Sequence, residues 1–386
     1  MHKSHLTLGF FGLAGVLVLC AALAFAFGAG RPRTFAAQGQ KPAVAQPVRP
    51  KIEVAFVLDT TSSMTGLIEG AKLKIWSIAS DIASGKPTPE LKVGLVAYRD
   101  RGDDYVTRVF PMTANLDEVY SSLRGLQAQG GGDEPEDVHA ALLAGIRQLD
   151  WSQGDNVLRL MFLVGDSPPH TYRDEPPEAQ ILAEAGKRGI QVNTIQCGST
   201  AETARVWKAI ADGADGFFTK VQQGGGMQAI ATPMDGKLSE LNGELGDTAI
   251  AFGDEKARSA AEARFVANKA MAAPIQADSA RFRAISKHVD TNDLVGAVAT
   301  GQADLDTLPA DALPPEMKVM SKPALKGYVA AKAAKRKAVE AQVLELAAQR
   351  DEFLKEEAAK RGDEEGVDAQ VKKAMAKQAK KVGVAY

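Results

Sequence analysis

The chain has 386 residues, enough for about two to three domains of ordinary size, and 45% of them are hydrophobic. Its 46 basic and 48 acidic side chains nearly cancel, which leaves a formal net charge of -2. This composition allows a packed core and lacks the basic character that nucleic-acid binding requires. We therefore expect no nucleic-acid partner.

The first 50 residues predict export rather than a folded domain. Residues 1–30 include a long uncharged apolar stretch, 6–30, after a short basic start. A bilayer span needs about 20 such residues, while small residues at 24–26 and 34–36 would also suit cleavage of a signal peptide. Residues 1–30 are thus a membrane anchor or a signal peptide. Residues 31–50 hold four prolines and predict a Pro/Ala/Gln-rich tether.

Short apolar runs alternate with amphipathic stretches over residues 51–245. The expected strands are 51–59, 91–100, 105–112, 157–166, 190–198 and 216–221. The expected helices are 64–84, 115–126, 137–149, 178–189, 202–213 and 227–244. Strands separated by helices of this length imply βαβ units, and continuous apolar strands fit burial on both faces. The sequence predicts one α/β domain, a doubly wound and mostly parallel sheet flanked by helices.

Residues 246–386 are rich in Ala, Lys, Glu and Arg and predict an α-helical region. Segments 254–272 and 322–361 have helical character, and the prolines in 307–317 separate them. The short apolar stripe of the second segment falls below the length of a coiled coil, so we expect helices that fold back on the α/β domain or on each other. The basic end, 371–386, is expected to be a solvated tail, with contact to anionic lipid or an acidic partner as the alternative.

Acidic residues follow three of the expected strands. The first group is Asp59 with Thr61 and Ser63, the second is the loop 130–137, and the third is Asp166. Ligands of open parallel sheets bind beyond the carboxyl ends of the strands. Carboxylate and hydroxyl oxygens suit Mg²⁺, Mn²⁺ or Ca²⁺ better than zinc. The pattern predicts one divalent cation at this edge, with Mg²⁺ as first choice.

The stretch "DTTSSM", residues 59–64, resembles the D-x-[ST]-x-S motif of von Willebrand factor type A (vWA) domains, where it begins a metal-ion-dependent adhesion site. The resemblance covers 51–245 and gives a Rossmann-like vWA fold. It implies that Asp59, Thr61 and Ser63 bind the metal directly or through water, and that Asp166 is the acid of a later loop. It also implies a protein partner, whose carboxylate often completes the metal shell.

One loop departs from the family pattern. The family supplies a threonine where this chain has the acidic loop 130–137, which contains no hydroxyl and is similar to that of a bacterial subgroup also attached to some atypical kinases. Asp133 is our candidate for the missing ligand. An acid there would strengthen metal binding and weaken the attraction of a partner's carboxylate. A neutral or basic partner group, or a metal with a chiefly structural role, therefore stays open.

Each candidate also has an ordinary structural explanation. A Ser or Thr after the first strand can cap a helix, Asp166 can form an Asx-turn, and Asp133 can complement a helix dipole. Asp100 and His170 are expected in the second layer or at the rim of the site. His139 is expected to be an ordinary helix residue.

The chain shows no catalytic set. Thr61 stands where a dehalogenase-type phosphatase would need a second Asp, and neither a G-x-S-x-G motif nor a P-loop lysine is present. We expect no enzyme. The sequence predicts a metal-dependent protein-binding vWA protein of the bacterial cell envelope, anchored in the inner membrane with a periplasmic domain or secreted after cleavage. The alternatives are a structural envelope scaffold whose metal only stabilises the fold, and a hydrolase that uses the acidic cleft.

Overall fold

The computed structural model describes residues 49–132, 135–287, 289–361 and 366–386. The expected anchor and most of the tether lie outside these ranges. Within them, no helix has the combination of length and apolar character that a membrane crossing needs. The described residues belong to one compact unit that begins at Val48.

The centre of the molecule is a six-stranded sheet with the order β3-β2-β1-β4-β5-β6. Its strands are β1 (Lys51–Asp59), β2 (Glu90–Tyr98), β3 (Thr107–Thr113), β4 (Val157–Gly165), β5 (Ile190–Cys197) and β6 (Phe218–Val221). Only the edge strand β3 runs antiparallel to its neighbour, and the other pairs are parallel. The predicted fold class is confirmed.

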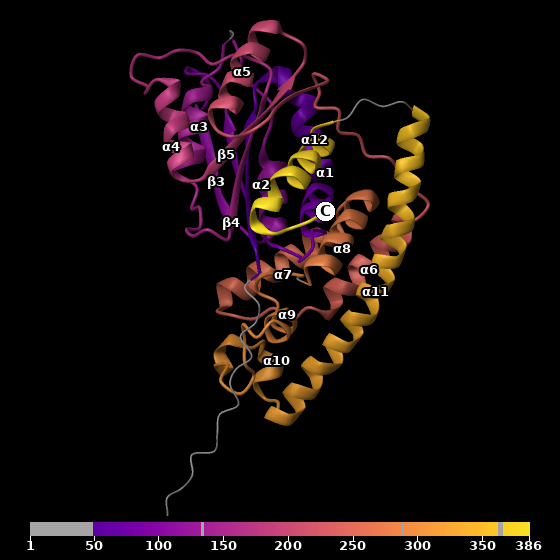
Figure 1. The fold of residues 1–386 in the computed structure, drawn as a ribbon. Helices are drawn as coiled ribbons and strands as arrows, with labels where there is room; N and C mark the ends of the chain where they lie inside the picture. The colour runs from indigo at the N-terminus through magenta and orange to yellow at the C-terminus, as the bar shows by residue number, and fades with distance from the viewer. Residues whose placement is uncertain (1–48, 133–134, 288, 362–365) are drawn as a thin grey trace, which may run out of the picture. The chain divides into compact units, whose positions relative to one another are not determined.

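Helices cover both faces of the sheet because its strands are apolar on both sides (Figure 1). Val54, Phe56 and Leu58 of β1 belong to one buried cluster, while Ala55 and Val57 belong to another. The first cluster includes helices α1 (Thr65–Ala83) and α2 (Leu116–Gly125). The second includes α3 (Val138–Arg147), α4 (Glu178–Lys187) and α5 (Ala201–Gly213). A short 3₁₀ turn, Ser62–Met64, joins β1 to α1.

The remaining helices follow β6. They are α6 (Asp235–Thr248), α7 (Glu255–Lys269), α8 (Ala273–Ser286), α9 (Leu294–Ala299), α10 (Pro315–Lys318), α11 (Lys322–Arg361) and α12 (Val367–Gln378), with 3₁₀ turns at Ala310–Ala312 and Ala379–Val382. Helix α6 begins at Asp235, later than the expected residue 227, and residues 227–232 have no regular secondary structure. A glycine-rich turn, in which Gly225 and Gly226 take positive φ, precedes them. Helix α8 packs on α1, and α6, α8 and α11 pack on one another.

Buried ion pairs hold the helical region together. Arg350 of α11 donates hydrogen bonds to Asp235 of α6 and Asp278 of α8, both at 2.7 Å. Arg283 of α8 donates to Asp117 at the start of α2. Burying a guanidinium is tolerable only when its donors are satisfied. These contacts therefore fix the helical region against the α/β domain as well as within itself.

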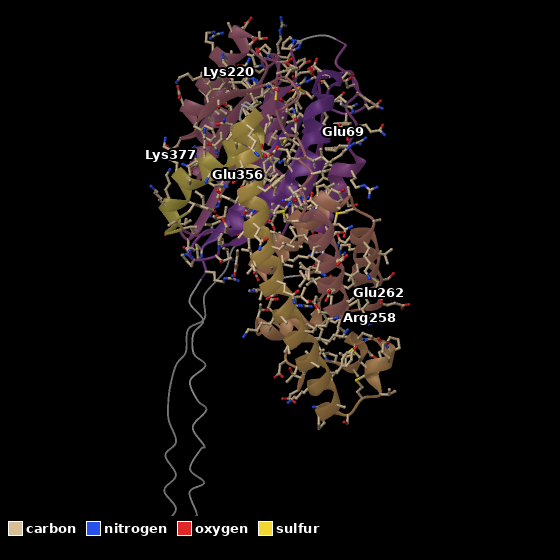
Figure 2. All side chains as sticks on the ribbon, turned by 90° about the vertical axis from the view of Figure 1, so that its right-hand side faces the viewer. Glu69, Lys220, Arg258, Glu262, Glu356 and Lys377 are labelled. Carbon is tan, nitrogen blue, oxygen red and sulfur yellow. The ribbon has the colours of Figure 1, made fainter. Side chains whose placement is uncertain are left out.

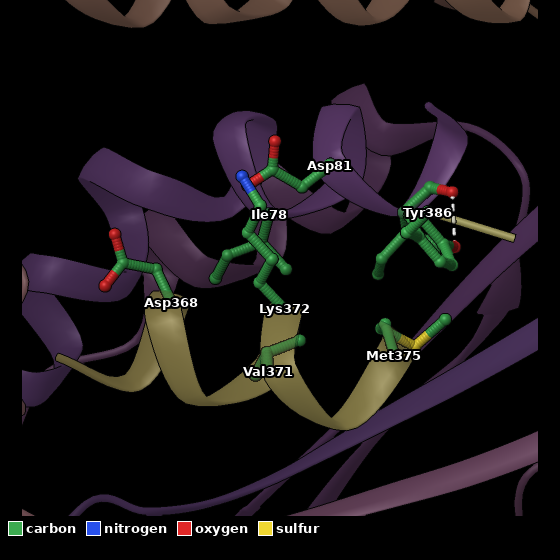
Figure 3. A pocket seen from close by; sticks show the side chains of 8 residues that line it. Ile78, Asp81, Asp368, Val371, Lys372, Met375 and Tyr386 are labelled. Carbon is green, nitrogen blue, oxygen red and sulfur yellow. Dashed lines mark hydrogen bonds and ion pairs between the residues drawn. The ribbon is translucent and has the colours of Figure 1, made fainter. Parts of the chain in front are cut away.

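The basic C-terminal tail is not a solvated end, and that prediction is wrong. Val371, Ala374 and Met375 of α12 are buried in the same cluster as α1 and the sheet. Figure 3 shows α12 along α1, with a cavity of only about 10 Å³ between them. The hydroxyl of Tyr386 donates to the carbonyl of Ile82 at 2.7 Å. The lysines give the tail its basic composition, but its apolar side completes the layer of helices on this face.

Two amides, Asn193 of β5 and Gln378 of α12, join the tail to the sheet. Each donates to the other, at 3.2 and 2.9 Å, and both side chains are buried. We expect Gln378→Ala to lower the free energy of unfolding by about 1–3 kcal/mol, because it leaves Asn193 without its partner. Chemical denaturation measures this change. Lys377→Ala, at an exposed neighbour, is the control. Equal effects of the two variants would contradict the interpretation.

Candidate metal centre

The loop after β1 places its side chains around Asp59, as the sequence predicts. The Asp59 carboxylate is fully buried. Its Oδ1 accepts hydrogen bonds from the amide and the hydroxyl of Thr61, at 2.9 and 2.7 Å. The Ser63 hydroxyl lies 3.3 Å from the Thr61 hydroxyl. No side chain caps the helix here, since neither Thr61 nor Met64 forms a capping bond. The hydroxyls thus face the acid instead of the helix.

The second oxygen of Asp59 has no hydrogen-bond partner among the described residues, although it is buried. Burial raises the pKa of Asp59 to about 7, and the nearby charge of Asp166 adds to the rise, while the Thr61 hydrogen bonds oppose it. A buried carboxylate without a second partner is costly when ionised. The site therefore favours either a proton or a cation at this oxygen.

Glu136, from the acidic loop, is the second acid of the site. Its side chain is 2% exposed, and its Oε2 also has no partner in the described structure. Burial raises its pKa to about 9, and the charges of Asp59, Asp100, Asp103 and Asp166 add to the rise.

The backbone fixes Glu136 in place. Its amide donates to the carbonyl of Pro168 and its carbonyl accepts from His170, at 3.2 and 2.7 Å. Gly131 leaves room beside it, because a Cβ there would lie 3.1 Å from the Cβ of Thr61 and 3.7 Å from Oε1 of Glu136. Glu136 thus lies beside the first loop.

Asp166 lies at the end of β4, where the sequence places it. Its carboxylate accepts from the hydroxyl of Ser167 at 3.2 Å and from the amide of Gln223. Gln223 belongs to the turn after β6, so a further loop of the sheet also reaches this point. Neither contact is to a backbone amide. The Asp166 side chain therefore does not form the Asx-turn that was the alternative explanation.

Tyr98, at the end of β2, lies on the sheet side of the site beside Asp59 and Gly165. It is fully buried, its hydroxyl has no partner among the described residues, and its pKa is raised by burial first and by Asp59 second. A Cβ on Gly165 would lie 2.5 Å from this hydroxyl and 3.0 Å from Oδ2 of Asp59. A side chain larger than glycine at 165 would therefore collide with both.

Around this centre, charged loops bind one another. Arg101 donates to Asp137, Asp174 and Glu175, and its guanidinium lies 3.7 Å from the ring centre of Tyr172. The Tyr172 hydroxyl donates to both oxygens of Asp100, at 2.7 and 2.9 Å. Asp100 is thus bound by a neighbouring loop, and its place in the second layer of a metal site stays a prediction.

The two histidines also take the predicted positions. His170 stacks on Tyr172 at the rim, with ring centres 4.3 Å apart. His139 is a buried residue of α3. Neither imidazole is needed to build the group of oxygens around Asp59.

Asp133 lies outside the described residues, and its proposed role stays a prediction. The acid that the sequence did not single out is Glu136. A signal was present, because Asp137 is the N-cap of α3 and accepts from the amide of Ala140 at 2.9 Å. Glu136 directly precedes this N-cap and so lies outside the helix, where its side chain can point toward the edge of the sheet.

In the described ranges, no three Asp, Glu, His or Cys side chains converge as a metal cluster by themselves. The candidate donors are instead a mixture of acids and hydroxyls. The sheet order, the strand-end Asp with its alternating hydroxyls and the later acid together define a Rossmann-like α/β domain with an oxygen-rich site at its carboxyl edge.

Comparison with known families agrees with this class. Residues 53–233 match the family model of the von Willebrand factor A domain, and this part of the chain is a vWA domain. The chain is 35% identical over 95 residues to von Willebrand factor A domain-containing protein 7 of Rattus norvegicus, which covers 25% of this chain and 10% of that protein. It is 27% identical over 119 residues to a putative ariadne-like RING finger protein of Acanthamoeba polyphaga mimivirus, covering 31% of this chain and 11% of that one. The chain thus spans about a tenth of these relatives.

Solved structures with a similar arrangement include the SpRpn10 VWA domain, at 12% identity and a TM-score of 0.35, covering 45% of this chain and 89% of that one. Another is proximal thread matrix protein 1 from the mussel byssus, at 15% identity and a TM-score of 0.35, covering 45% and 42%.

The raised pKa of Asp59 predicts a pH effect on stability in the presence of a chelator. The folded state holds the proton more tightly than the unfolded chain, so this contribution is fully present below pH 3.8 and is lost as the pH rises through about 7. The loss amounts to at most about 4 kcal/mol. We expect chemical denaturation in EDTA to show stability falling from pH 5 to pH 8. Asp59→Asn, which stays neutral and keeps an acceptor for Thr61, should make this fall smaller by the contribution of Asp59.

Asp155→Asn, at an exposed position before β4 and so at the opposite end of that strand from Asp166, is the matched control and should leave the fall unchanged. Because Glu136 also has a raised pKa, part of the fall is expected to remain in Asp59→Asn. A fall as steep in Asp59→Asn as in the unsubstituted protein would show that Asp59 ionises without cost, contrary to the geometry.

Proposed function

We propose that the chain is a metal-dependent protein-binding module that holds one divalent cation at the carboxyl edge of its vWA domain. Asp59, Thr61, Ser63, Glu136 and Asp166 would supply the oxygen ligands, some through water. The observation that carries the proposal is the pair of buried carboxylate oxygens, Oδ2 of Asp59 and Oε2 of Glu136, that have no partner in the described structure. A cation would satisfy both.

The donor chemistry fits a hard cation. Carboxylates and hydroxyls are the ligands of Mg²⁺, Mn²⁺ and Ca²⁺, and the group contains no thiolate that would select a softer metal. The one described cysteine near these acids, Cys197, is buried, and burial raises the pKa of its thiol, so it is held as a neutral thiol. When bound, the cation would supply positive charge to residues that otherwise repel one another.

The charge balance bears on the partner. Asp59, Glu136 and Asp166 together carry more negative charge than one divalent cation neutralises. A partner carboxylate would meet residual repulsion at this site, whereas a hydroxyl, an amide or a basic side chain would not. We therefore propose a neutral or basic contact group on the partner protein. Because residues 6–30 are apolar and uncharged, we also propose that the module is located in the cell envelope.

Metal binding should stabilise the fold. We expect Mg²⁺ at about 100 times its dissociation constant to add about 2.7 kcal/mol to the stability, seen as a rise in Tm at pH 8 in calorimetry. Glu136→Gln and Asp59→Asn should each lose most of this rise, because each removes a charged oxygen from the site. Addition of Mg²⁺ to the unsubstituted protein in weak buffer should also release protons, since the raised pKa values keep these acids partly protonated.

Asp133→Asn separates the two candidate acids of the loop. If Glu136 is the ligand, Asp133→Asn keeps the Mg²⁺-dependent rise in Tm and Glu136→Gln loses it. The opposite result would assign the role to Asp133. No rise with Mg²⁺, Mn²⁺ or Ca²⁺ in the unsubstituted protein would overturn the metal site itself.

Partner binding has a separate test. The full chain is crosslinked in its native envelope with and without EDTA, and captured proteins are compared with those of Asp59→Asn and the control Asp155→Asn. A partner lost with EDTA and with Asp59→Asn, but kept by Asp155→Asn, supports the module. A partner captured equally in all four conditions, with only the Tm lowered by Asp59→Asn, would favour the scaffold alternative.

A further inference from the structure

Helix α11 (Lys322–Arg361) has one side packed and one side open. Its buried positions repeat every seven residues, at Val329, Arg336, Val343 and Arg350. The opposite side is exposed and consists largely of small residues. Its exposed small residues are Gly327, Ala330, Ala331, Ala334, Ala338 and Ala341. Figure 2 looks toward this part of the chain and labels Glu356. From Gly327 to Ala341 the middle of this face carries only small side chains, and beyond Ala341 the same face continues with exposed Glu345 and Glu352.

Charge is divided along the same helix. Every charged residue from 322 to 337 is basic: Lys322, Lys326, Lys332, Lys335, Arg336 and Lys337. From 338 to 357, the acids are Glu340, Glu345, Asp351, Glu352, Glu356 and Glu357, against only Arg350 and Lys355. A helix dipole favours acids near the N-terminus and bases near the C-terminus. That effect is confined to the end turns, and Lys360 in the last turn agrees with it. Arg336, Glu340 and Arg350 are buried in ion pairs within the chain. The division remains among the exposed charges, which are Lys322, Lys326, Lys335 and Lys337 in the first part and Glu345, Asp351, Glu352, Lys355 and Glu356 in the second.

An antiparallel second copy accounts for both features. It brings the basic half of one helix beside the acidic half of the other and sets the two helix dipoles in opposition. We propose that two copies of this chain pair antiparallel through the exposed face of α11, with the two-fold axis near Ala341. This interface is isologous, so each contact occurs twice.

The register follows from individual residues. With the axis at Ala341, Lys337 of one copy lies opposite Glu345 of the other. Neither side chain has a partner in the described part of the chain. Leu344, which is 38% exposed, comes opposite Ala338. A large apolar side chain thus meets a small one on each side of the axis, and small residues allow interaxial distances of about 8–10 Å.

Cysteine crosslinking tests this arrangement in the full chain. Ala341→Cys places two thiols at the axis, close enough for a disulfide. Ala331→Cys is a matched control on the same face. Ten residues from the axis, it lies about 30 Å from its own copy in the antiparallel pair. After mild oxidation, we expect a dimer band on a non-reducing gel for Ala341→Cys, and none for Ala331→Cys beyond that of the unsubstituted chain, which keeps Cys20 and Cys197.

Each other outcome overturns the proposal. Crosslinking of both variants indicates a parallel pair or random collision. Crosslinking of neither indicates that α11 faces something other than a second copy.

Charge reversal provides a second measurement that does not depend on the cysteine at the axis alone. In the Ala341→Cys background, Lys337→Glu places acids opposite acids at two symmetric points and should lower the crosslinked fraction several-fold. Adding Glu345→Lys restores opposite charges and should restore the crosslinked fraction. Loss without restoration would show that Lys337 acts within its own chain. Circular dichroism of each variant checks that the helix is retained.

Discussion

A carboxylate buried at the end of a core strand is the constraint on which the arrangement of this site depends. Asp59 is fully buried, and an ionised carboxylate away from water is stable only with enough donors or a cation around it. The first loop supplies two donors, both from Thr61 and both to the same oxygen. The other oxygen has no partner among the described residues, and the charges that act on the pKa of Asp59 include that of Asp166 and no base. The fold therefore leaves a buried carboxylate that a proton or a cation would stabilise.

The protein holds this group together without neutralising it. Two arginines of the neighbouring loops, Arg99 and Arg101, bind loop backbone and other acids instead of Asp59. Arg99, which is 3% exposed, donates to the carbonyls of Thr60 and Gln127, at 3.2 and 2.8 Å. Arg101 binds three carboxylates at the rim. These cations fix the loops in position while the central charge stays unbalanced, which is the condition that a preorganised cation site requires.

Much of the fold could be predicted from the sequence because its signals are local. The strands are continuous apolar runs, and Asp59 and Asp166 end two of them, so their common edge followed from the parallel sheet alone. Glu136 was harder to single out. Its position depends on backbone hydrogen bonds to residues 168–170, which lie on another loop, and four acids in one short loop gave no reason to prefer it over Asp133.

The role of the C-terminal helix was hidden for a related reason. Val371 and Met375 are four residues apart and form an apolar side, but the lysines around them dominate the composition. The three-dimensional structure shows why a helix is needed there. A glycine-rich turn follows β6, so no helix from that part of the chain covers the sheet beside α1. Helix α12 fills that position from the far end of the chain, and its Val367 amide donates to the carbonyl of Gly225 at 2.9 Å. Segments α6–α11 are therefore an insertion between the last strand and the last covering helix.

The insertion carries a surface that is separate from the acids at the sheet edge. Asp59, Glu136 and Asp166 lie at the edge of the sheet, and none of these three belongs to α11. A partner at the sheet edge and a second copy at α11 could therefore bind at the same time. Pairing through α11 would place two cation sites in one particle. A partner with two contact groups would then bind the second site as an intramolecular event, and its overall affinity would exceed that of either site without any new contact. If the contact depends on the metal as we propose, it would be weak, because the acids of the site already balance the charge of the cation. Pairing would then raise the overall affinity for such a partner.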